Sequence, residues 1–246
     1  MPLVPVATGR RPDVRACSWC HLPNGAGHPQ SASLAGLSRD YLTRQLADFK
    51  SGARHSSVGN SIMATITRAM TADEARAAVD YYARLRRRPW IRVVETTMAP
   101  KTEIVEGGLR IQHEPAALEP LGERIVEVPQ FPARTRFYDS HVGFAAYVPV
   151  GSIKRGRDFV TTGAGKVQAC SMCHGKDLRG TERAPDSKLP VPGLTGRSPT
   201  YIVRQLYDFN SGARSGEGAA LMKPEAIQMS LRDMIAVAAY LGSLAP

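Results

Sequence analysis

Apolar residues recur at helical spacing in two stretches of the chain, one near each end. They are Leu42, Leu46 and Phe49 in the first stretch, and Ile202, Leu206 and Phe209 in the second. This spacing places each set on one face of a helix, where it would pack against a core. Ser38 and Ser198 stand where helix N-caps are expected. Gly52 and Gly212 are suited to end the helices in the left-handed conformation.

The two stretches are copies of one another. Residues 41–54, YLTRQLADFKSGAR, match residues 201–214, YIVRQLYDFNSGAR, at ten of fourteen positions. Around this anchor the same features come in the same order in both halves: Cys-x-x-Cys-His, Leu-x-Gly, the matched helix, a methionine and a last helix. That last helix begins with a capping-box pattern at Thr71 and with a near match, carrying Asp233 in place of Glu or Gln, at Ser230. The chain is therefore predicted to be a tandem duplication.

The segment between the two copies has a different pattern. It contains many prolines and short runs of β-branched or aromatic residues, which favour strands. Gly107 and Gly108 are suited to turn a hairpin. We expect a mainly α fold, with two like helical domains at residues 1–91 and 151–246 joined by a β-containing, Pro-rich insert at residues 92–150.

Charge and hydropathy narrow the class of protein. A net charge of +10 and a pI of about 9.8 indicate an acidic partner, an anionic surface or nucleic acid. Nucleic acid is disfavoured because the basic residues are scattered and are not concentrated with aromatic ones. No run approaches the roughly 18 apolar residues that cross a bilayer. We expect protein partners with acidic docking surfaces and no nucleic acid.

All four cysteines fall in two identical frames, each followed by a histidine. The frames are Cys17, Cys20 and His21 in the first half, and Cys170, Cys173 and His174 in the second. Cys-x-x-Cys-His is the sequence at which haem c is attached, with the histidine placed to bind the iron. A four-cysteine zinc site is disfavoured because the two pairs are about 150 residues apart, not roughly 15 to 20. A redox-active dithiol gives no reason for a histidine after both pairs. We expect two covalently attached haem c groups.

The second axial ligand of each iron is expected among the methionines. Two pairs occupy equivalent places in the repeats, Met63 with Met222 and Met70 with Met229. Met70 and Met229 immediately precede helix N-caps, where an apolar residue packs back on the helix as a hydrophobic staple. Met63 and Met222 fall in segments that we expect to be irregular, where a side chain can be aimed at a cofactor. We interpret them as the ligands, with core packing as the alternative.

Four other histidines are weaker candidates. His28 and His55 have no counterpart in the second half and are expected on the surface, while His113 and His141 belong to the insert. With histidine on one side and a thioether on the other, an iron has no open position. That ligand set favours electron transfer over catalysis.

These features resemble the cytochrome c4 family of two-haem electron carriers. Both halves have the family's Cys-x-x-Cys-His, Leu-x-Gly, Tyr-x-x-x-Gln-Leu-x-x-Phe helix, Gly-x-Arg and downstream Met, over residues 5–90 and 151–246. The resemblance implies a cytochrome c fold in each half and residence in the bacterial periplasm. It also implies electron transfer from a quinol-oxidising complex or dehydrogenase towards a membrane-bound terminal oxidase. Carried over by motif, the iron ligands are His21 with Met63 and His174 with Met222.

The chain also departs from the family pattern. The family places a proline two residues before the Leu of Leu-x-Gly, where its carbonyl can orient the ligating histidine. The second half has Pro192 there, but the first half has Ala32, and the long insert is not part of the minimal pattern.

Two arginines in the matched segment suggest contacts with the haem. Arg54 and Arg214 occupy the same place in the repeat, directly after the glycines that end the matched helices. A guanidinium group pairs well with a carboxylate, so we expect each arginine near a propionate of its own haem. A solvated role is the alternative.

Two further expectations concern activity and processing. A two-haem peroxidase or a sulfur-compound dehydrogenase would need one iron with a displaceable or unusual ligand, whereas both halves offer the same histidine and methionine. We therefore expect an electron carrier and not an enzyme. No export signal precedes Cys17, and the helix-like run ahead of the second frame has only a few counterpart residues ahead of the first. We expect that Met1 is not the start of the native precursor.

Overall fold

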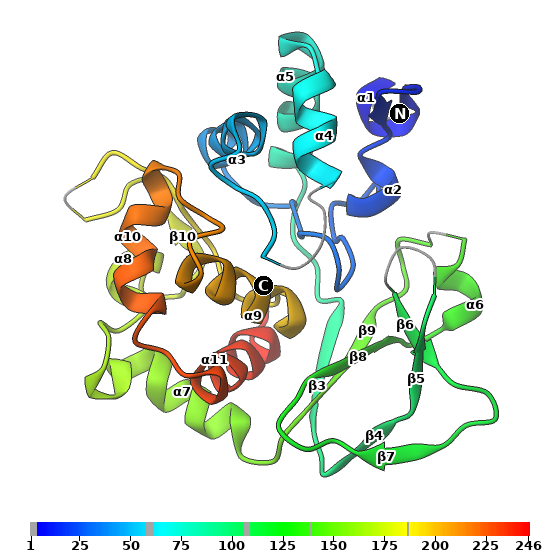
Figure 1. Cartoon of the computed structure of the whole chain (residues 1–246), viewed down its shortest axis with the longest axis vertical. Coiled ribbons are helices and arrows are strands. Elements are labelled where there is room, and N and C mark those ends of the chain that lie inside the picture. The colour runs from blue at the N-terminus through cyan, green and yellow to red at the C-terminus, as the bar shows by residue number, and fades with distance from the viewer. Residues whose placement is uncertain (1–3, 58–61, 106–108, 138, 186) are drawn as a thin grey trace.

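The structure is a computed structural model that describes residues 4–57, 62–105, 109–137, 139–185 and 187–246. The first half of the chain is helical apart from one short strand pair. Its elements are α1 (Val4–Ala7), β1 (Gly9–Arg10), β2 (Val14–Arg15), α2 (Ser18–His21), α3 (Arg39–Ser51), α4 (Ile62–Ala69) and α5 (Ala72–Ala83). Figure 1 shows this half at the top of the molecule.

The second half repeats the order of the helices, with longer ones at its start and end, but its strand pair follows the Cys-x-x-Cys-His turn where that of the first half precedes it. Its elements are α7 (Ser152–Thr162), a 3-10 turn (Gly163–Gly165), α8 (Ser171–His174), β10 (Gly180–Thr181), β11 (Val191–Pro192), α9 (Pro199–Asn210), α10 (Glu217–Ala226) and α11 (Leu231–Ser243). Helix α11 packs along α7, as α5 packs against the shorter α1. None of the helices in the described ranges is long and apolar enough to cross a membrane.

The helix ends form as predicted. The side chains of Ser38 and Ser198 cap α3 and α9. Gly52 ends α3 with a φ of 87°, in the left-handed region where a glycine carries no steric cost. Capping boxes close at Thr71 and at Ser230, so an aspartate serves in the second box as well as glutamate does in the first. The local signals at these four helices were sufficient to place their starts.

The insert is built from short strands. They are β3 (Ile91–Glu95), β4 (Met98–Pro100), β5 (Thr102–Ile104), β6 (Arg110–Gln112), β7 (Leu118–Pro120), β8 (Val126–Pro129) and β9 (Phe144–Val148), with the short helix α6 (Pro132–Thr135) before β9. Strand β9 lies between β3, to which it is parallel, and β8, to which it is antiparallel. The pairs β4–β7 and β5–β6 are antiparallel ribbons. The expected hairpin residues Gly107 and Gly108 lie outside the described residues.

Each part of the chain has its own apolar core. In the first half Leu42, Met70, Val79 and Tyr82 pack together. The second half has a corresponding core from α7, α9 and α11, and the insert has a smaller one from β4 and β8. The insert also adds Ile125 to the core of the second half.

The two helical halves meet where their matched helices end. The backbone of the segment after α3 pairs with that of the segment after α9: His55 N–H donates to the carbonyl of Ala213 at 2.9 Å, and Ser215 N–H donates to that of Ala53 at 2.7 Å. The bonds are reciprocal, and residues at equivalent places in the repeat therefore face each other. The insert, at the lower right of Figure 1, packs beside the C-terminal half through β3 and α11.

Candidate functional site

Each Cys-x-x-Cys-His frame forms one short helical turn. In the first frame the backbone N–H of His21 donates to the carbonyl of Cys17 at 2.9 Å, and His174 bonds to Cys170 in the same way at 2.9 Å. All four cysteines are free and partly exposed. The turn therefore presents both thiols and the imidazole of a frame from one compact stretch of backbone.

The four thiols are not activated nucleophiles. Burial raises the pKa of Cys17 to about 11 and that of Cys170 to about 11, and it also raises the pKa of Cys20 and Cys173. A dithiol oxidoreductase requires the opposite shift, because its thiolate is the attacking group. The geometry of the frames thus argues against a redox-active dithiol.

Both frame histidines are buried and held by a backbone carbonyl. Nδ1 of His21 lies 2.8 Å from the carbonyl oxygen of Ala32, and Nδ1 of His174 lies 2.8 Å from that of Pro192. Because a carbonyl only accepts, Nδ1 carries the proton and donates it. Burial lowers the pKa of both imidazoles, which keeps them neutral. Nε2 of each ring therefore keeps its lone pair for a metal.

The departure at Ala32 does not change this bond. The first half has alanine where the second half has Pro192, yet the two distances between Nδ1 and the carbonyl oxygen are equal at 2.8 Å. A backbone carbonyl needs no particular side chain. The proline affects the stiffness of the segment and not the presence of the acceptor.

The expected methionine ligands lie in helices, and the prediction of irregular segments was wrong. Met63 belongs to α4 and Met222 to α10, and both side chains are partly buried. Helix α10 forms despite Pro224 within it, so the proline did not exclude a helix. The register of a helix, and not the freedom of a loop, aims these two side chains. Their role as iron ligands stays a prediction.

The other two methionines fill the cores. Met70 and Met229 are 7% and 8% exposed and pack in the apolar clusters of the first and second halves. Each directly precedes an N-cap, as a hydrophobic staple does. Packing therefore accounts for both of them.

Arg54 and Arg214 do not lie apart in their own domains but meet at the boundary between the halves. Arg54 is 8% exposed and donates to Oε1 of Gln45 at 2.5 Å and to Oε1 of Gln205 at 2.7 Å. Arg214 is 7% exposed and donates to the same two oxygens, at 2.8 Å and 3.1 Å. Each guanidinium also lies over a phenylalanine ring of its own half. A solvated role is excluded for both side chains.

The two glutamines were not singled out in the sequence, although a signal existed. Gln45 and Gln205 are identical polar residues at equivalent places in a matched helix, on the face that also carries apolar core residues. Polar residues repeated on such a face need a partner when they are buried. Arg54 and Arg214 are those partners, and each glutamine serves both.

The remaining histidines differ from one another. His55 and His141 are exposed as expected, and His141 contacts Asp139 at 3.1 Å. His28 is partly buried and not a surface residue, because its loop folds back toward His21. Burial lowers the pKa of His28 to about 4. His113 is partly buried in the insert.

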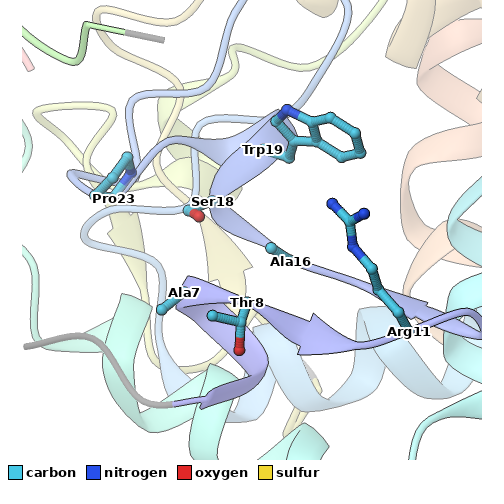
Figure 2. Close-up of a pocket in the computed structure, with 7 residues that line it drawn as sticks. All are labelled: Ala7, Thr8, Arg11, Ala16, Ser18, Trp19 and Pro23. Atoms are coloured by element: carbon cyan, nitrogen blue, oxygen red, sulfur yellow. The ribbon is translucent and has the colours of Figure 1, made fainter. Parts of the chain in front are cut away.

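A cavity of about 410 Å³ opens beside the first frame, with Trp19 on its wall (Figure 2). Its lining residues are Ala7, Thr8, Arg11, Ala16, Ser18, Trp19 and Pro23. The guanidinium carbon of Arg11 lies 5.7 Å from the centre of the Trp19 ring, and that of Arg15 lies 5.9 Å from it. Both arginines are exposed and make no ion pair with a carboxylate in the described ranges. The edge of the first frame is thus aromatic and cationic.

The donor set fits a covalently attached haem. Each half offers two thiols, one neutral imidazole with a free Nε2 and one thioether. Among the described residues, no cluster of three or more His, Cys, Asp or Glu side chains is placed to bind a metal ion directly, without a haem. A zinc site made from both cysteine pairs is therefore not formed.

Three curated proteins are similar to this chain. One, from Thiomonas intermedia, is called thiosulfate dehydrogenase electron acceptor; it is 25% identical over 234 residues, which are 94% of this chain and 80% of that protein. Cytochrome c4 of Stutzerimonas stutzeri is 24% identical over 236 residues, 94% of this chain and 85% of that protein. Cytochrome c-554(548) of Halomonas halodenitrificans is 38% identical over 82 residues, which are 33% of this chain and 90% of that protein. No family model matches the chain.

Solved structures show the same fold. Cytochrome c4 of Acidithiobacillus ferrooxidans aligns with a TM-score of 0.56 at 22% identity, over 93% of this chain and 98% of that one. The thiosulfate dehydrogenase TsdBA of Marichromatium purpuratum aligns with a TM-score of 0.62 at 22% identity. The alignment covers 98% of this chain but only 39% of that protein. The whole length of the chain is thus accounted for by this two-domain fold.

Proposed function

Because this chain belongs to the two-haem c-type cytochromes of the cytochrome c4 family, we propose that it is a periplasmic carrier that takes electrons from a quinol-oxidising complex or dehydrogenase and delivers them to a terminal oxidase. Two haem c groups are its covalently bound cofactors. One is attached at Cys17 and Cys20, the other at Cys170 and Cys173.

The observation that carries the proposal is that His21 and His174 have the same surroundings and the same hydrogen bond. Both rings are buried and neutral, and in both Nδ1 is held 2.8 Å from a backbone carbonyl. His21 with Met63 and His174 with Met222 are the ligand pairs of the two irons. A haem iron held by histidine and methionine exchanges one electron and has no open position for substrate.

Arg54 and Arg214 serve the haem propionates. Their guanidinium groups are buried with glutamines and tyrosines and lack a salt bridge to any carboxylate in the described parts of the chain. Asp48 and Asp208 accept from Gln45 and Gln205 and act on the arginines without direct contact, so the two buried positive charges can still be stabilised by an anion that touches them. A propionate is such an anion, and the shared boundary lets the two arginines act on both haems.

The electron donor is proposed to be a dehydrogenase, and the name of the Thiomonas relative favours one that oxidises thiosulfate. The similarity to TsdBA allows a second candidate, in which the chain itself belongs to such an enzyme. We favour the carrier because the two halves present the same donor set and no cysteine is left over. An enzyme of this class would need one iron that differs from the other.

Mass measurement, spectroscopy and a redox titration of the purified protein test the proposal. We expect a mass increase of two covalent haems, a low-spin c-type spectrum and two one-electron steps. The reduced spectrum should not change with carbon monoxide, and thiosulfate alone should not be oxidised. Binding of carbon monoxide by one haem together with turnover of thiosulfate would establish the enzyme instead.

A further inference from the structure

Arg197 is a buried arginine that contacts both halves of the molecule and that the repeat does not explain. It is 5% exposed, lies in the segment before α9 and makes no ion pair with any carboxylate in the described ranges. Its equivalent in the first half is Leu37, a residue of the apolar core. Burying an unpaired guanidinium is costly, so a role other than packing is needed to account for it.

The two hydrogen bonds of Arg197 reach both halves of the molecule. Nε donates to the carbonyl of Gly193 at 2.5 Å, within the second half. A terminal nitrogen donates to the carbonyl of Ser33 at 2.7 Å, in the first half. Bonds from a charged donor are stronger than those between neutral groups, and both are shielded from water here.

The two carbonyls that Arg197 binds adjoin those that hold the histidines. Ser33 directly follows Ala32, whose carbonyl accepts from His21, and Gly193 directly follows Pro192, whose carbonyl accepts from His174. One planar guanidinium thus joins the two backbone segments that set the orientation of both rings. A shift of either segment would be passed to the other through a rigid group.

We propose that Arg197 is a positioning residue for both haem sites, tying the segment that orients His21 to the segment that orients His174. This rests on the proposed function, because it takes these histidines as iron ligands. The remaining terminal nitrogen of Arg197 is buried without a hydrogen-bond partner among the described residues. Only the second half supplies this link, because Leu37, the equivalent residue in the first half, has no side-chain donor.

The test compares R197L, R197Q and R197K with the unchanged holoprotein. R197L places the residue of the first half at this position, and R197K keeps the charge but cannot bond both carbonyls in the same way. Two quantities are measured: the midpoint potentials of both haems, and the exchange rates of the Nδ1 protons of His21 and His174 by NMR in the reduced state.

In R197L and R197Q both midpoints should fall, because a buried positive charge beside the backbone segments that hold both histidines is lost, and both Nδ1 protons should exchange at least several-fold faster. R197K should retain most of the potentials but still show faster exchange at both histidines. The control is E217Q, which breaks the exposed 2.5 Å contact between Arg44 and Glu217 across the same boundary. It should change neither quantity.

A result in which only the second haem responds, or in which R197K exchanges like the unchanged protein, overturns the proposal. So does an equal response to E217Q, since that would show general loosening of the boundary. If R197L does not fold, R197K and R197Q still show whether the charge of Arg197 or its two hydrogen bonds are responsible for the effect. Failure of the proposed function is distinct, because the unchanged protein would then lack the two-haem spectrum.

Discussion

At the scale of single residues, the site depends on side chains whose chemistry is set by a neighbouring carbonyl or by burial. His21 and His174 are neutral and fixed in one tautomer because each donates from Nδ1 to a carbonyl 2.8 Å away. Met63 and Met222 are partly buried, whereas Met70 and Met229 are buried in the cores. The assignment of these two as ligands is therefore open to a direct test.

We predict that M63A and M222A each remove about half of the sulfur-to-iron charge-transfer band of the oxidised protein and lower the potential of one haem, because a thioether ligand favours ferrous iron. The measurements are the near-infrared spectrum and a redox titration. M70A and M229A are the matched controls and should keep the full band while lowering the stability. Loss of the band in M70A or M229A, with the band intact in M63A and M222A, would reverse the assignment.

At the scale of elements, helix α9 is placed by the insert as well as by its own cap. Glu127 of β8 is 3% exposed and accepts from Ser198 Oγ at 2.8 Å and from the backbone N–H of Thr200 at 2.7 Å. Ser198 is the N-cap of α9, the helix that carries Gln205 to the arginine pair. A carboxylate from a strand thus anchors the start of a helix that reaches the boundary of the two halves.

The stability should depend on pH through Glu127. Burial raises the pKa of this carboxyl above its ordinary value, so the native state binds the proton more tightly than the unfolded chain. The free energy of unfolding should then fall as the pH rises from the ordinary glutamate pKa through the raised one. Denaturant unfolding at several pH values measures this slope, and E127Q should flatten it. An unchanged slope in E127Q would assign the dependence to another group.

At the scale of the whole molecule, a chain of net charge +10 presents a basic edge at its first haem attachment. Arg11 and Arg15 lie beside Trp19, next to the cysteines of the first frame. At the second frame the corresponding residue is Met172, which is 63% exposed and offers no aromatic ring to a cation. The exposed residue beside the two cysteines is thus a tryptophan with two arginines in the first frame and a methionine in the second.

We predict that the double variant R11E/R15E slows electron exchange with the anion ferricyanide and speeds exchange with a tris-phenanthroline cobalt(III) cation, each by about three- to tenfold at low ionic strength. Stopped-flow kinetics at two salt concentrations measure both rates, and added salt should shrink the difference. The matched control R92E/R110E makes the same change in net charge on two exposed residues of the insert and should have a much smaller effect. Equal effects of both variants would show that only net charge matters.

The sequence by itself determined what depends on neighbouring residues. The attachment frames, the caps at Ser38, Ser198, Thr71 and Ser230, and the duplication are all local patterns, because a helix start or a thiol pair is specified within a few residues. The fold class follows from them, since the repeated order of elements leaves little choice of architecture.

Only the tertiary structure decided what depends on segments far apart in the chain. Arg54 and Arg214 meet at one boundary because the segments after α3 and α9 pair with each other, and their expected place near the propionates of their own haems stays a prediction. The bridge at Arg197 and the anchor at Glu127 each join residues more than 70 positions apart, and neither has a counterpart in the repeat that would mark it. Met63 and Met222 lie in helices whose formation depends on packing against α3 and α9, which no local signal reports.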